Sequence, residues 1–249
     1  MSQTEFKPEQ FLAIYPPGIE RHYWTLARNL IIKKELKRLD LHSRRLLEIG
    51  CGRGVVVDFL RQAGFDCHGV ELASVEPLPS VTPYIHSGIE FSSLDKNFSL
   101  SIEVVLLLDV IEHLPDDASF LKRVRQSFPN AEYLIITVPA RQELWSNYDV
   151  FNGHYRRYAL AQLRQSMRQG GWQSLRASYF FHTLYLPARL LLQVFGKRQT
   201  KIIPPVGAIT LLHKILAGFF AFDYFILPPH YLGTSILAAA RREDKKPEL

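Results

Sequence analysis

A short apolar strand that runs straight into closely spaced glycines constrains the fold of this chain more than any other feature. Residues 44–49 predict a buried strand, and Gly50, Gly52 and Gly54 follow it directly. Glycines in such a turn let a ligand approach the backbone without clashing with Cβ atoms, at the N-terminus of the next helix. The chain is therefore expected to begin its core with a strand, a ligand-binding turn and a helix over residues 55–64.

The rest of the chain alternates between short apolar runs and longer segments with helical spacing. Further strands are predicted at residues 67–72, 84–86, 104–108, 133–138, 175–181 and 234–240. Apolar residues recur at helical spacing before the first strand, after Pro115 and over residues 160–170. Strands that alternate with helices need crossover connections, which favour an α/β fold with a doubly wound, mainly parallel sheet.

The length of 249 residues suits a single domain with one large core. Within it we distinguish an N-terminal helical cap at 1–43, a ligand-binding core at 44–180, an apolar helical insert at 181–232, a last strand at 233–241 and a charged tail at 242–249. Cys51 and Cys67 are too few for a disulfide framework and lack the spacing of a metal motif. The first residues also lack the pattern of a signal peptide. We therefore expect a cytoplasmic protein without a metal site.

The insert at 181–232 is rich in Leu, Phe, Ile and Tyr, with a basic island that includes Lys197 and Lys201. Its second half is long enough to span a membrane, but Lys214 and Asp223 interrupt it, and ionised groups are costly at bilayer depth. We predict helices that lie on an apolar partner instead of crossing a bilayer. The pattern fits an anionic membrane surface, a lid over an apolar substrate, a dimer interface or extra core packing, and all four stay open.

Two acidic residues near the glycine turn narrow the choice of ligand. Glu48 would repel a pyrophosphate but would attract a cation such as an ammonium group. The glycine spacing also departs from the G-x-G-x-x-G of dinucleotide-binding turns, and no Gly-Lys-Ser/Thr follows as in a P-loop. Glu71 ends the next predicted strand, where an acid can accept hydrogen bonds from both hydroxyls of a ribose. The predicted ligand carries a ribose and a positive charge but no pyrophosphate.

S-adenosylmethionine meets that description, and the chain resembles the class I methyltransferases that use it. Glu48 and the three glycines match the E/D-x-G-x-G-x-G turn of that family, Glu71 matches its ribose-binding acid, and residues 109–117 resemble the segment after its fourth strand. The chain is most similar to a bacterial type 11/12/23-like subgroup with a Gly-His-Tyr-Arg-Arg-Tyr loop, here residues 153–158. The resemblance implies a Rossmann-like, seven-stranded sheet with an N-terminal helix and the helical insert before the last strand.

The resemblance also implies which residues bind S-adenosylmethionine and its product, S-adenosylhomocysteine. The implied contacts are Glu48, Gly50, Cys51, Gly52, Gly54, Glu71, Leu72 and Asp109, together with His22 and Trp24 from a helix that covers the cofactor. Two alternatives stay open, because Asp109 could cap a helix and the N-terminal helix could serve stability alone. Many relatives place an Asp after the third strand to bind adenine, and residues 86–91 contain none.

The loop after the fifth predicted strand supplies the candidates for catalysis. His154 could act as a general base, because an ordinary imidazole pKa of about 6.5 lies near working pH. Arg156 and Arg157 could bind a carboxylate or phosphate with paired hydrogen bonds. We predict catalytic roles for His154, Asp109 and Arg156, and substrate binding by His113, Tyr155 and Arg157. A structural histidine with solvated arginines is the alternative reading of this loop.

The net charge of +6 and the pI near 9.3 suit an anionic small molecule, nucleic acid or membrane surface, and they select none of these. The resembling subgroup often accompanies glycan and lipid-linked sugar synthesis. We therefore expect O-methylation of a glycan-related, lipid-linked or amphipathic small molecule at the cytoplasmic membrane face. A tRNA, rRNA or DNA methyltransferase, a small-molecule N- or C-methyltransferase and an inactive scaffold are the alternatives. The chain lacks an Asn-Pro-Pro-Tyr signature, which disfavours nucleic acid as a partner, and a homodimer stays open.

Overall fold

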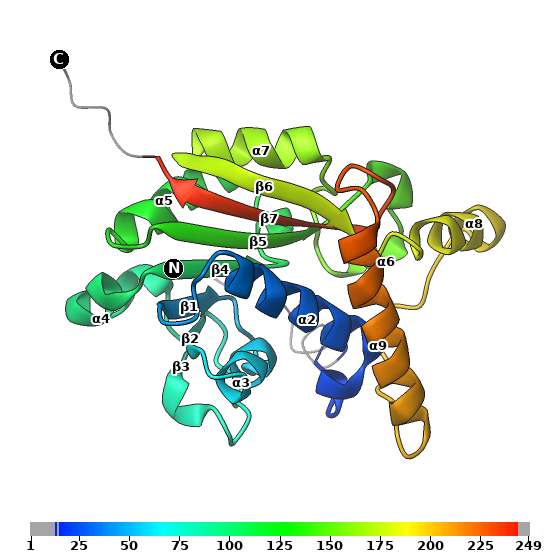
Figure 1. Ribbon diagram of the computed structural model, residues 1–249, viewed down its shortest axis with the longest axis horizontal. Coiled ribbons are helices and arrows are strands. Elements are labelled where there is room, and N and C mark those ends of the chain that lie inside the picture. Colours follow the sequence, from blue (N-terminus) through cyan, green and yellow to red (C-terminus); the bar gives the residue numbers. More distant parts are fainter. Residues whose placement is uncertain (1–12, 14, 244–249) are drawn as a thin grey trace.

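A computed structural model describes residues 13 and 15–243, which contain one mixed sheet of seven strands (Figure 1). The strands are β1 (Arg45–Ile49), β2 (Asp66–Glu71), β3 (Ile85–Ser87), β4 (Val104–Leu108), β5 (Tyr133–Pro139), β6 (Trp172–Phe180) and β7 (Ser235–Arg242). Their order is β3-β2-β1-β4-β5-β7-β6, with β1 to β5 parallel and β7 antiparallel to both of its neighbours. This order confirms the doubly wound, mainly parallel α/β fold.

The strand positions follow from how each strand is buried. β1 and β4 lie within a residue of their predicted bounds, because each is a nearly continuous apolar run covered on both faces. β6 begins at Trp172, three residues before the predicted start at 175, because the first half of this edge strand alternates between buried and exposed residues. β7 runs from Ser235 to Arg242, slightly later than the predicted 233–241. Residues 1–12 and 14 of the predicted cap, and 244–249 of the predicted tail, lie outside the described residues.

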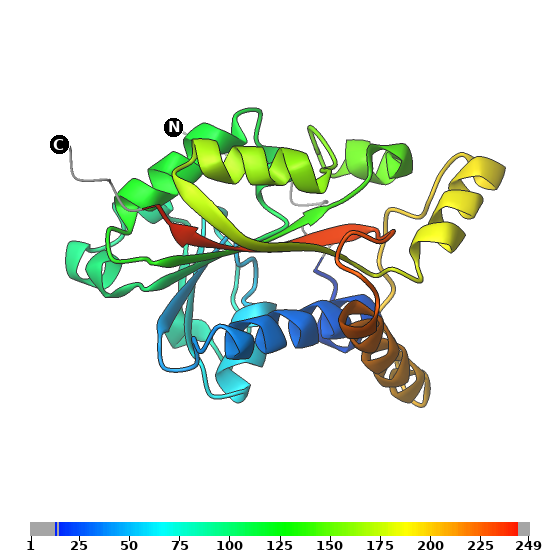
Figure 2. The same ribbon diagram turned by 45° about the horizontal axis from the view of Figure 1, so that its top comes forward.

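Helices lie on both faces of the sheet and beyond its carboxyl edge. They are α2 (Tyr23–Arg38), α3 (Val55–Gln62), α4 (Lys96–Ser101), α5 (Asp117–Ser127), α6 (Asn147–Phe151), α7 (Leu160–Gln169), α8 (Tyr185–Phe195) and α9 (Ile209–Ile226). Short 3-10 turns are η1 (Ile19–Arg21), η2 (Thr82–Tyr84), η3 (Phe91–Ser93), η4 (Ile111–His113) and η5 (Gln142–Leu144). Figure 2 shows α5 and α7 on one face and α2, α3 and α9 on the other. The buried core is therefore divided into two layers by the sheet.

The helix after β4 begins slightly later than Pro115 suggests. α5 starts at Asp117, and the side chain of Asp116 caps it by accepting the N–H of Ser119 at 3.0 Å. Asp109 therefore does not cap this helix, which removes one of the two readings that the sequence left open. The short α6 was not predicted, although Ser146 and Asp149 form the capping box that marks a helix start.

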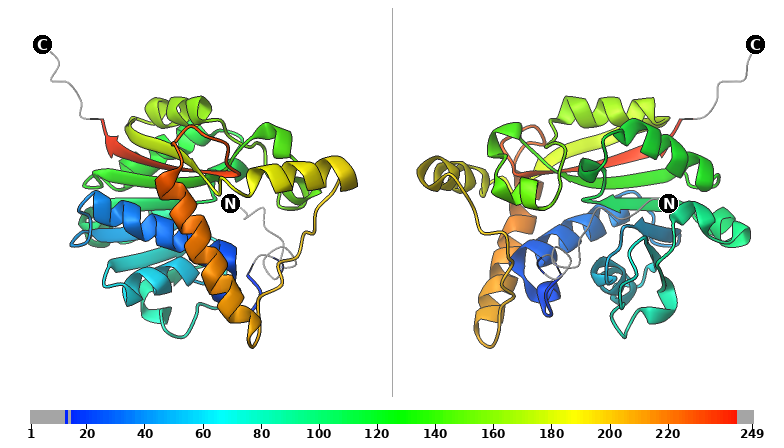
Figure 3. Two further views of the ribbon diagram at one scale, coloured as in Figure 1. Left: turned by 45° about the vertical axis from the view of Figure 1, so that its right-hand side comes forward. Right: turned by 180° about the vertical axis from the view of Figure 1, so that it is seen from behind.

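The predicted insert forms two helices, α8 and α9, between β6 and β7 (Figure 3). Phe180 at the end of β6 pairs with Ser235 at the start of β7, so the insert leaves and rejoins the sheet at neighbouring points. α9 crosses α2, and its buried residues Phe220 and Tyr224 join the core beneath the sheet. The insert thereby reaches the edge of the sheet at which β4 and β5 end (Figure 1).

A buried hydroxyl ties the loop after β5 to the helices above the sheet. Tyr158 is 1% exposed, and its hydroxyl donates to Oδ2 of Asp117 at 2.7 Å. The same oxygen accepts the hydroxyl of Ser166 at 2.9 Å, so one carboxylate joins α5, α7 and this loop. Burial and Asp117 together raise the pKa of Tyr158, which keeps the phenol a hydrogen-bond donor.

We expect Tyr158→Phe to lower the free energy of unfolding by about 1–3 kcal/mol, because it leaves a buried acceptor with one bond fewer. Tyr155→Phe is the matched control, since Tyr155 is 50% exposed and its loss should change stability by less than about 0.5 kcal/mol. Urea denaturation of both variants checks this. Equal midpoints for the two variants would show that the Asp117 bond contributes nothing.

Candidate functional site

The glycine turn lies where β1, β2 and β4 end, at the carboxyl edge of the parallel part of the sheet. Gly50, Gly52 and Gly54 have φ of 76°, 55° and 83°, a region that side chains with a Cβ rarely adopt. A Cβ on Gly52 would lie 2.7 Å from the ring of Tyr15, so the turn also packs closely against the N-terminal segment. Gly54 precedes α3. The first N–H groups of this helix, which have no partner within the helix, therefore lie at this edge of the sheet.

Glu71 holds the turn against the end of β2. Its Oε2 accepts the N–H of Gly52 and its Oε1 accepts the N–H of Ala73, both at 2.9 Å. Burial raises the pKa of Glu71, while these backbone bonds oppose that rise. Each carboxylate oxygen keeps a further lone pair, so Glu71 can still accept bonds from two ribose hydroxyls.

Glu48 is the most unusual acid of the site. It is 3% exposed, and its Oε2 has no hydrogen-bond partner among the described residues. Burial raises the pKa of Glu48 to about 8; Arg28 opposes that rise, and the charges of Glu71 and Asp109 add to it. Oε2 of this buried acid is left without a hydrogen-bond partner, and the ammonium group of a bound ligand would supply one. The turn and its acids therefore fit the predicted cofactor.

Arg28 on α2 brings a positive charge to the same edge. Its guanidinium donates to Oδ2 of Asp109, which follows β4 and has φ of 58°. The guanidinium also lies 4.7 Å from the ring centroid of Trp24. A Cβ on Gly50 would lie 2.9 Å from Val110, so the segment after β4 packs directly on the glycine turn. Asp109 thus lies next to the segment that packs on the glycine turn and is paired with Arg28, and its contact with the cofactor stays a prediction.

His22 and Trp24 lie where α2 meets the insert. The Nδ1 of His22 accepts the N–H of Trp24 at 3.4 Å and caps α2. Burial and the neighbouring His213 lower the pKa of His22 to about 4, so the ring is neutral at pH 7. Trp24 packs on Phe181 with 5.9 Å between ring centroids. Both residues have a clear packing role, and their contact with the cofactor stays a prediction.

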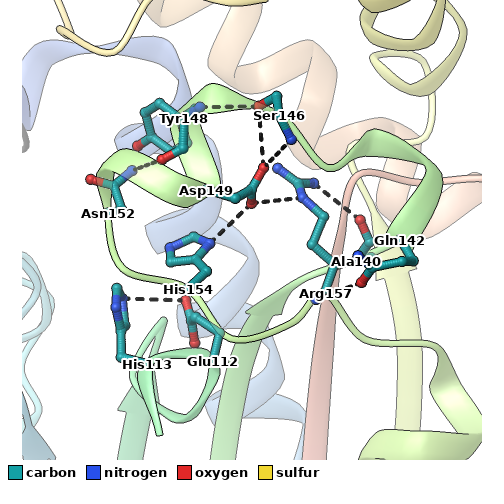
Figure 4. A network of polar contacts seen from close by, with 10 residues as sticks. All are labelled: Glu112, His113, Ala140, Gln142, Ser146, Tyr148, Asp149, Asn152, His154 and Arg157. Carbon is teal, nitrogen blue, oxygen red and sulfur yellow. Dashed lines mark hydrogen bonds and ion pairs between the residues drawn. The ribbon is translucent and has the colours of Figure 1, made fainter. Parts of the chain in front are cut away.

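Asp149 organises the loop that carries His154 (Figure 4). Its Oδ1 lies 3.0 Å from Nδ1 of His154 and accepts the Nε–H of Arg157 at 2.8 Å. Its Oδ2 accepts the backbone N–H of Ser146 at 2.9 Å, which completes the cap of α6. Asp149 is fully buried, but the bonds from His154 and Arg157 outweigh this burial and lower its pKa to about 2. The carboxylate is therefore charged at any working pH.

Glu112, His113 and His154 converge below this cluster (Figure 4). One ligand-type atom from each lies within 4.8 Å of the others, a spacing at which three such groups could hold a metal ion. The rings of His113 and His154 lie edge to face with centroids 4.6 Å apart. Burial and the nearby His154 lower the pKa of His113 to about 3, whereas burial and Asp109 raise the pKa of Glu112. A neutral imidazole and a buried carboxyl group with a raised pKa thus face His154.

The two arginines of the loop are engaged within the protein. Arg157 is 5% exposed and binds Asp149 and the carbonyl of Ala140, so it positions the loop. Arg156 donates to the carbonyls of Leu114 and Pro115 at 3.0 and 2.6 Å. The bonds of Arg156 hold the loop against the segment after β4. The guanidinium of Arg157 is buried against Asp149 and Ala140, and its contact with the substrate stays a prediction.

Cys51, Leu72 and Tyr155 complete the set of predicted residues, and their contacts with a ligand stay predictions. Cys51 is buried, and its backbone N–H donates to Val70 at 3.3 Å. Leu72 follows β2 directly. Tyr155 is half exposed, and its N–H donates to the carbonyl of Glu112 at 2.7 Å. In the segment 86–91, the N–H of Ile89 donates to the Glu71 carbonyl at 3.2 Å.

The sequence analysis did not assign roles to Tyr15, Arg28 and Asp149. Tyr15 and Arg28 reach the site only through the packing of the N-terminal segment, and no spacing signals this. Burial raises the pKa of Tyr15, and the charge of Glu71 adds to this rise, which places the phenol among the acids of the site. Asp149 had a signal, because Ser146-x-x-Asp149 is a capping box and an acid next to the His154 loop is a natural partner for an imidazole.

A family model described as a methyltransferase domain matches residues 23–177. Curated relatives are similar to the chain over a shorter stretch. A ubiquinone biosynthesis O-methyltransferase from Paracidovorax citrulli is 29% identical over 90 residues, which cover 33% of this chain and 38% of that protein. The enzyme of the same name from Pseudomonas fluorescens SBW25 is 25% identical over 93 residues, 34% of this chain and 40% of that protein. The aligned stretch thus spans about two fifths of the relatives' length.

Solved structures share the fold at low identity. A 1,6-didemethyltoxoflavin-N1-methyltransferase from Burkholderia thailandensis, solved with S-adenosylhomocysteine, has a TM-score of 0.53 and 15% identity, covering 98% of this chain and 94% of that chain. A phosphoethanolamine N-methyltransferase 2 from Haemonchus contortus, also solved with S-adenosylhomocysteine, has a TM-score of 0.51 and 15% identity, covering 94% of this chain and 59% of that chain.

The raised pKa of Glu48 gives cofactor binding a defined pH dependence. A bound cation lowers the pKa of an adjacent acid, so a Glu48 that is protonated at pH 7 must release its proton on binding. The affinity for S-adenosylhomocysteine, which carries an ammonium group, should rise up to about tenfold per pH unit below pH 8 and level off above it.

Calorimetry in buffers of different ionisation enthalpy measures this proton release. We expect close to one proton released at pH 7, fewer above pH 8, and none in Glu48→Gln. Proton release that is unchanged in Glu48→Gln would assign the proton to another group and contradict the prediction.

Proposed function

The chain belongs to the methyltransferase-domain family, which uses S-adenosylmethionine, and we propose that it methylates a hydroxyl oxygen of an amphipathic or lipid-linked small molecule. The single observation that carries the choice of oxygen is the Asp149–His154 pair, since a hydroxyl acceptor must lose a proton during methyl transfer. The curated relatives named above are O-methyltransferases, which supports the same choice.

The Asp149 carboxylate defines the state of His154. Because Asp149 is charged and lies 3.0 Å from Nδ1, the neutral imidazole keeps its proton on Nδ1 and presents the Nε2 lone pair to an acceptor. Arg157 holds Asp149 from the other side at 2.8 Å. His154 is thus oriented by a buried ion pair, as expected of a base that must stay in one position.

Methyl transfer is an in-line displacement that the residues of the site can support. S-adenosylmethionine, when bound, supplies a methyl group on a sulfonium; the new C–O bond forms as the C–S bond breaks and its electron pair stays on sulfur. Nε2 of His154 takes the hydroxyl proton. Glu71 and the glycine turn hold the nucleoside, and Glu48 stabilises the positive charge of the methionine part.

The class of acceptor is proposed from the surroundings of this site. The apolar insert 181–232 lies at the carboxyl edge of the sheet beside α6 (Figure 1). An acceptor would therefore approach past the exposed leucine and phenylalanine side chains of α8 and α9. This environment suits a polyprenyl phenol or a lipid-linked sugar at the cytoplasmic membrane face. The names of the curated relatives, which refer to ubiquinone biosynthesis, support an amphipathic acceptor of this kind.

We expect His154→Ala to lower kcat by about 10²- to 10⁴-fold while the Kd for S-adenosylhomocysteine stays within about twofold, because the base acts on the acceptor and not on the cofactor. The assay measures release of S-adenosylhomocysteine with detergent-solubilised polyprenyl phenols and lipid-linked sugars as acceptors. His42→Ala, an exposed histidine just before β1, is the control and should keep full activity.

A His154→Ala variant with at least a tenth of wild-type kcat would remove His154 as the base. A wild-type enzyme that binds the cofactor but methylates none of these acceptors, while methylating amines or RNA, would overturn the proposed O-methylation.

A further inference from the structure

Helix α9 carries apolar side chains on two opposite sides. Its inner side packs into the core through Ala217, Phe220 and Tyr224. The outer side carries a stripe with exposed fractions between 50% and 64%, formed by Leu211, Ile215, Phe219, Phe222 and Ile226. These positions are three or four residues apart, so they form one continuous line along the helix. A helix that faces water carries polar residues on such a line.

The contacts that anchor α9 to the rest of the protein exclude a transmembrane helix at this position. α9 is long and apolar enough to cross a membrane by length and composition, the one such helix in the described part of the chain, and 28% of that window is buried. Asp223, however, is buried and accepts the N–H and the hydroxyl of Thr183 at 3.1 and 2.8 Å, which ties α9 to the segment after β6. The helix also packs on α2. A helix fixed to the sheet in this way can lie in a membrane surface but not cross the bilayer.

Helix α8 adds a second apolar face at the same end of the molecule. It projects from the body of the protein (Figure 3), and Tyr185 is its one buried residue. The exposed side chains on it are Leu186, Leu190, Leu191, Val194 and Phe195. Most of the exposed large apolar side chains in the described residues therefore belong to α8, α9 and their connection. An uncovered area of this kind marks an interaction surface.

A row of basic side chains lies next to α9. Lys33, Lys34, Lys37 and Arg38 of α2 line one side of a groove of about 730 Å³, and α9 supplies its apolar side. The ammonium of Lys34 lies 3.4 Å from the ring centroid of Phe225. Lys34 and Lys37 are exposed. Positive and apolar groups thus lie side by side across one groove, as the headgroups and chains of an anionic lipid require.

We propose that the outer stripe of α9, the apolar face of α8 and the lysine row of α2, together called the docking face, bind the surface of an anionic phospholipid bilayer. The apolar stripes enter the boundary between headgroups and acyl chains, and Lys34 and Lys37 meet the phosphates. The inference deepens the proposed function, on which it rests, by naming the membrane that presents the acceptor. A second copy of the chain fits less well, because a symmetric dimer through this face would bring the same lysine rows together.

The docking face is rigidly connected to the site. The Tyr185 hydroxyl donates to Glu143 of η5 at 2.9 Å, and the backbone N–H of Arg198 donates to the side chain of Asn147 at 2.8 Å. Asn147 is the first residue of α6. The N-cap of this helix is Ser146, which is hydrogen-bonded to Asp149. The insert is therefore attached to the loop that holds His154, so a bilayer on the docking face lies close to the proposed acceptor pocket.

Cosedimentation with vesicles tests the proposal. The full chain is mixed with phosphatidylcholine vesicles that contain phosphatidylglycerol, or with phosphatidylcholine alone. We expect at least about tenfold stronger binding to the anionic vesicles, weakened by salt. Two variants should each lose at least about tenfold: K34E/K37E and L211Q/I215Q/F222Q. Two matched controls on other surfaces, K96E/K122E and L100Q/L175Q, should stay within about twofold of wild type.

Each variant is first shown to be folded by its heat of binding to S-adenosylhomocysteine. A folded monomer that ignores anionic vesicles, or controls that lose as much binding as the docking-face variants, would overturn the proposal. So would a dimer in light scattering that L211Q/I215Q/F222Q dissociates. Vesicle binding that fails while solubilised acceptors are still methylated rejects the docking face alone. Vesicle binding without any hydroxyl methylation rejects the proposed function alone.

Discussion

Three carboxylates lie at the ends of adjacent strands, and the rest of the site depends on how their charges are balanced. Glu48, Glu71 and Asp109 follow or end β1, β2 and β4, and the guanidinium of Arg28 faces them from α2. Glu71 is satisfied by two backbone N–H groups, whereas one oxygen of Glu48 is left without a partner. A cation bound beside Glu48 would lower the pKa of this acid and pair with its carboxylate, which explains why this edge suits a cationic nucleoside and not a pyrophosphate.

The sequence predicts those parts of the fold that depend on local pattern. β4 was placed to within a residue because burial on both faces makes it a continuous apolar run, and the turn was recognised because its glycines are required by left-handed φ values. The first three residues of β6 were missed because an edge strand exposes alternate residues. The partners of His154 and Asp109 depend on packing between distant segments. Arg28 lies 81 residues from Asp109 in the chain, so no spacing in the sequence could connect them.

Helix α2 contributes residues both to the acidic edge of the sheet and to the basic row beside α9. Its N-terminal half carries Arg28 toward the acids of the cofactor site, and its C-terminal half carries Lys34 and Lys37 beside α9. A single rigid helix therefore fixes the distance between the pocket and the basic row. On the opposite face of the sheet, Asp117 joins the His154 loop to α5 and α7 through two hydroxyl groups, and its Oδ2 also lies 3.4 Å from the guanidinium of Arg156. The acids beside the glycine turn and the His154 loop are thus both held by elements that pack on the sheet.

The pairing of Phe180 with Ser235 has a consequence for how such enzymes diversify. Because the 54 residues between them leave and rejoin the antiparallel ladder at one paired position, a tight hairpin could replace this segment without changing the strand order. The sheet and the helices that cover it would keep their architecture while the segment between β6 and β7 is exchanged. Exchange of this segment alone would let the same methyltransferase core evolve to work in a different cellular location.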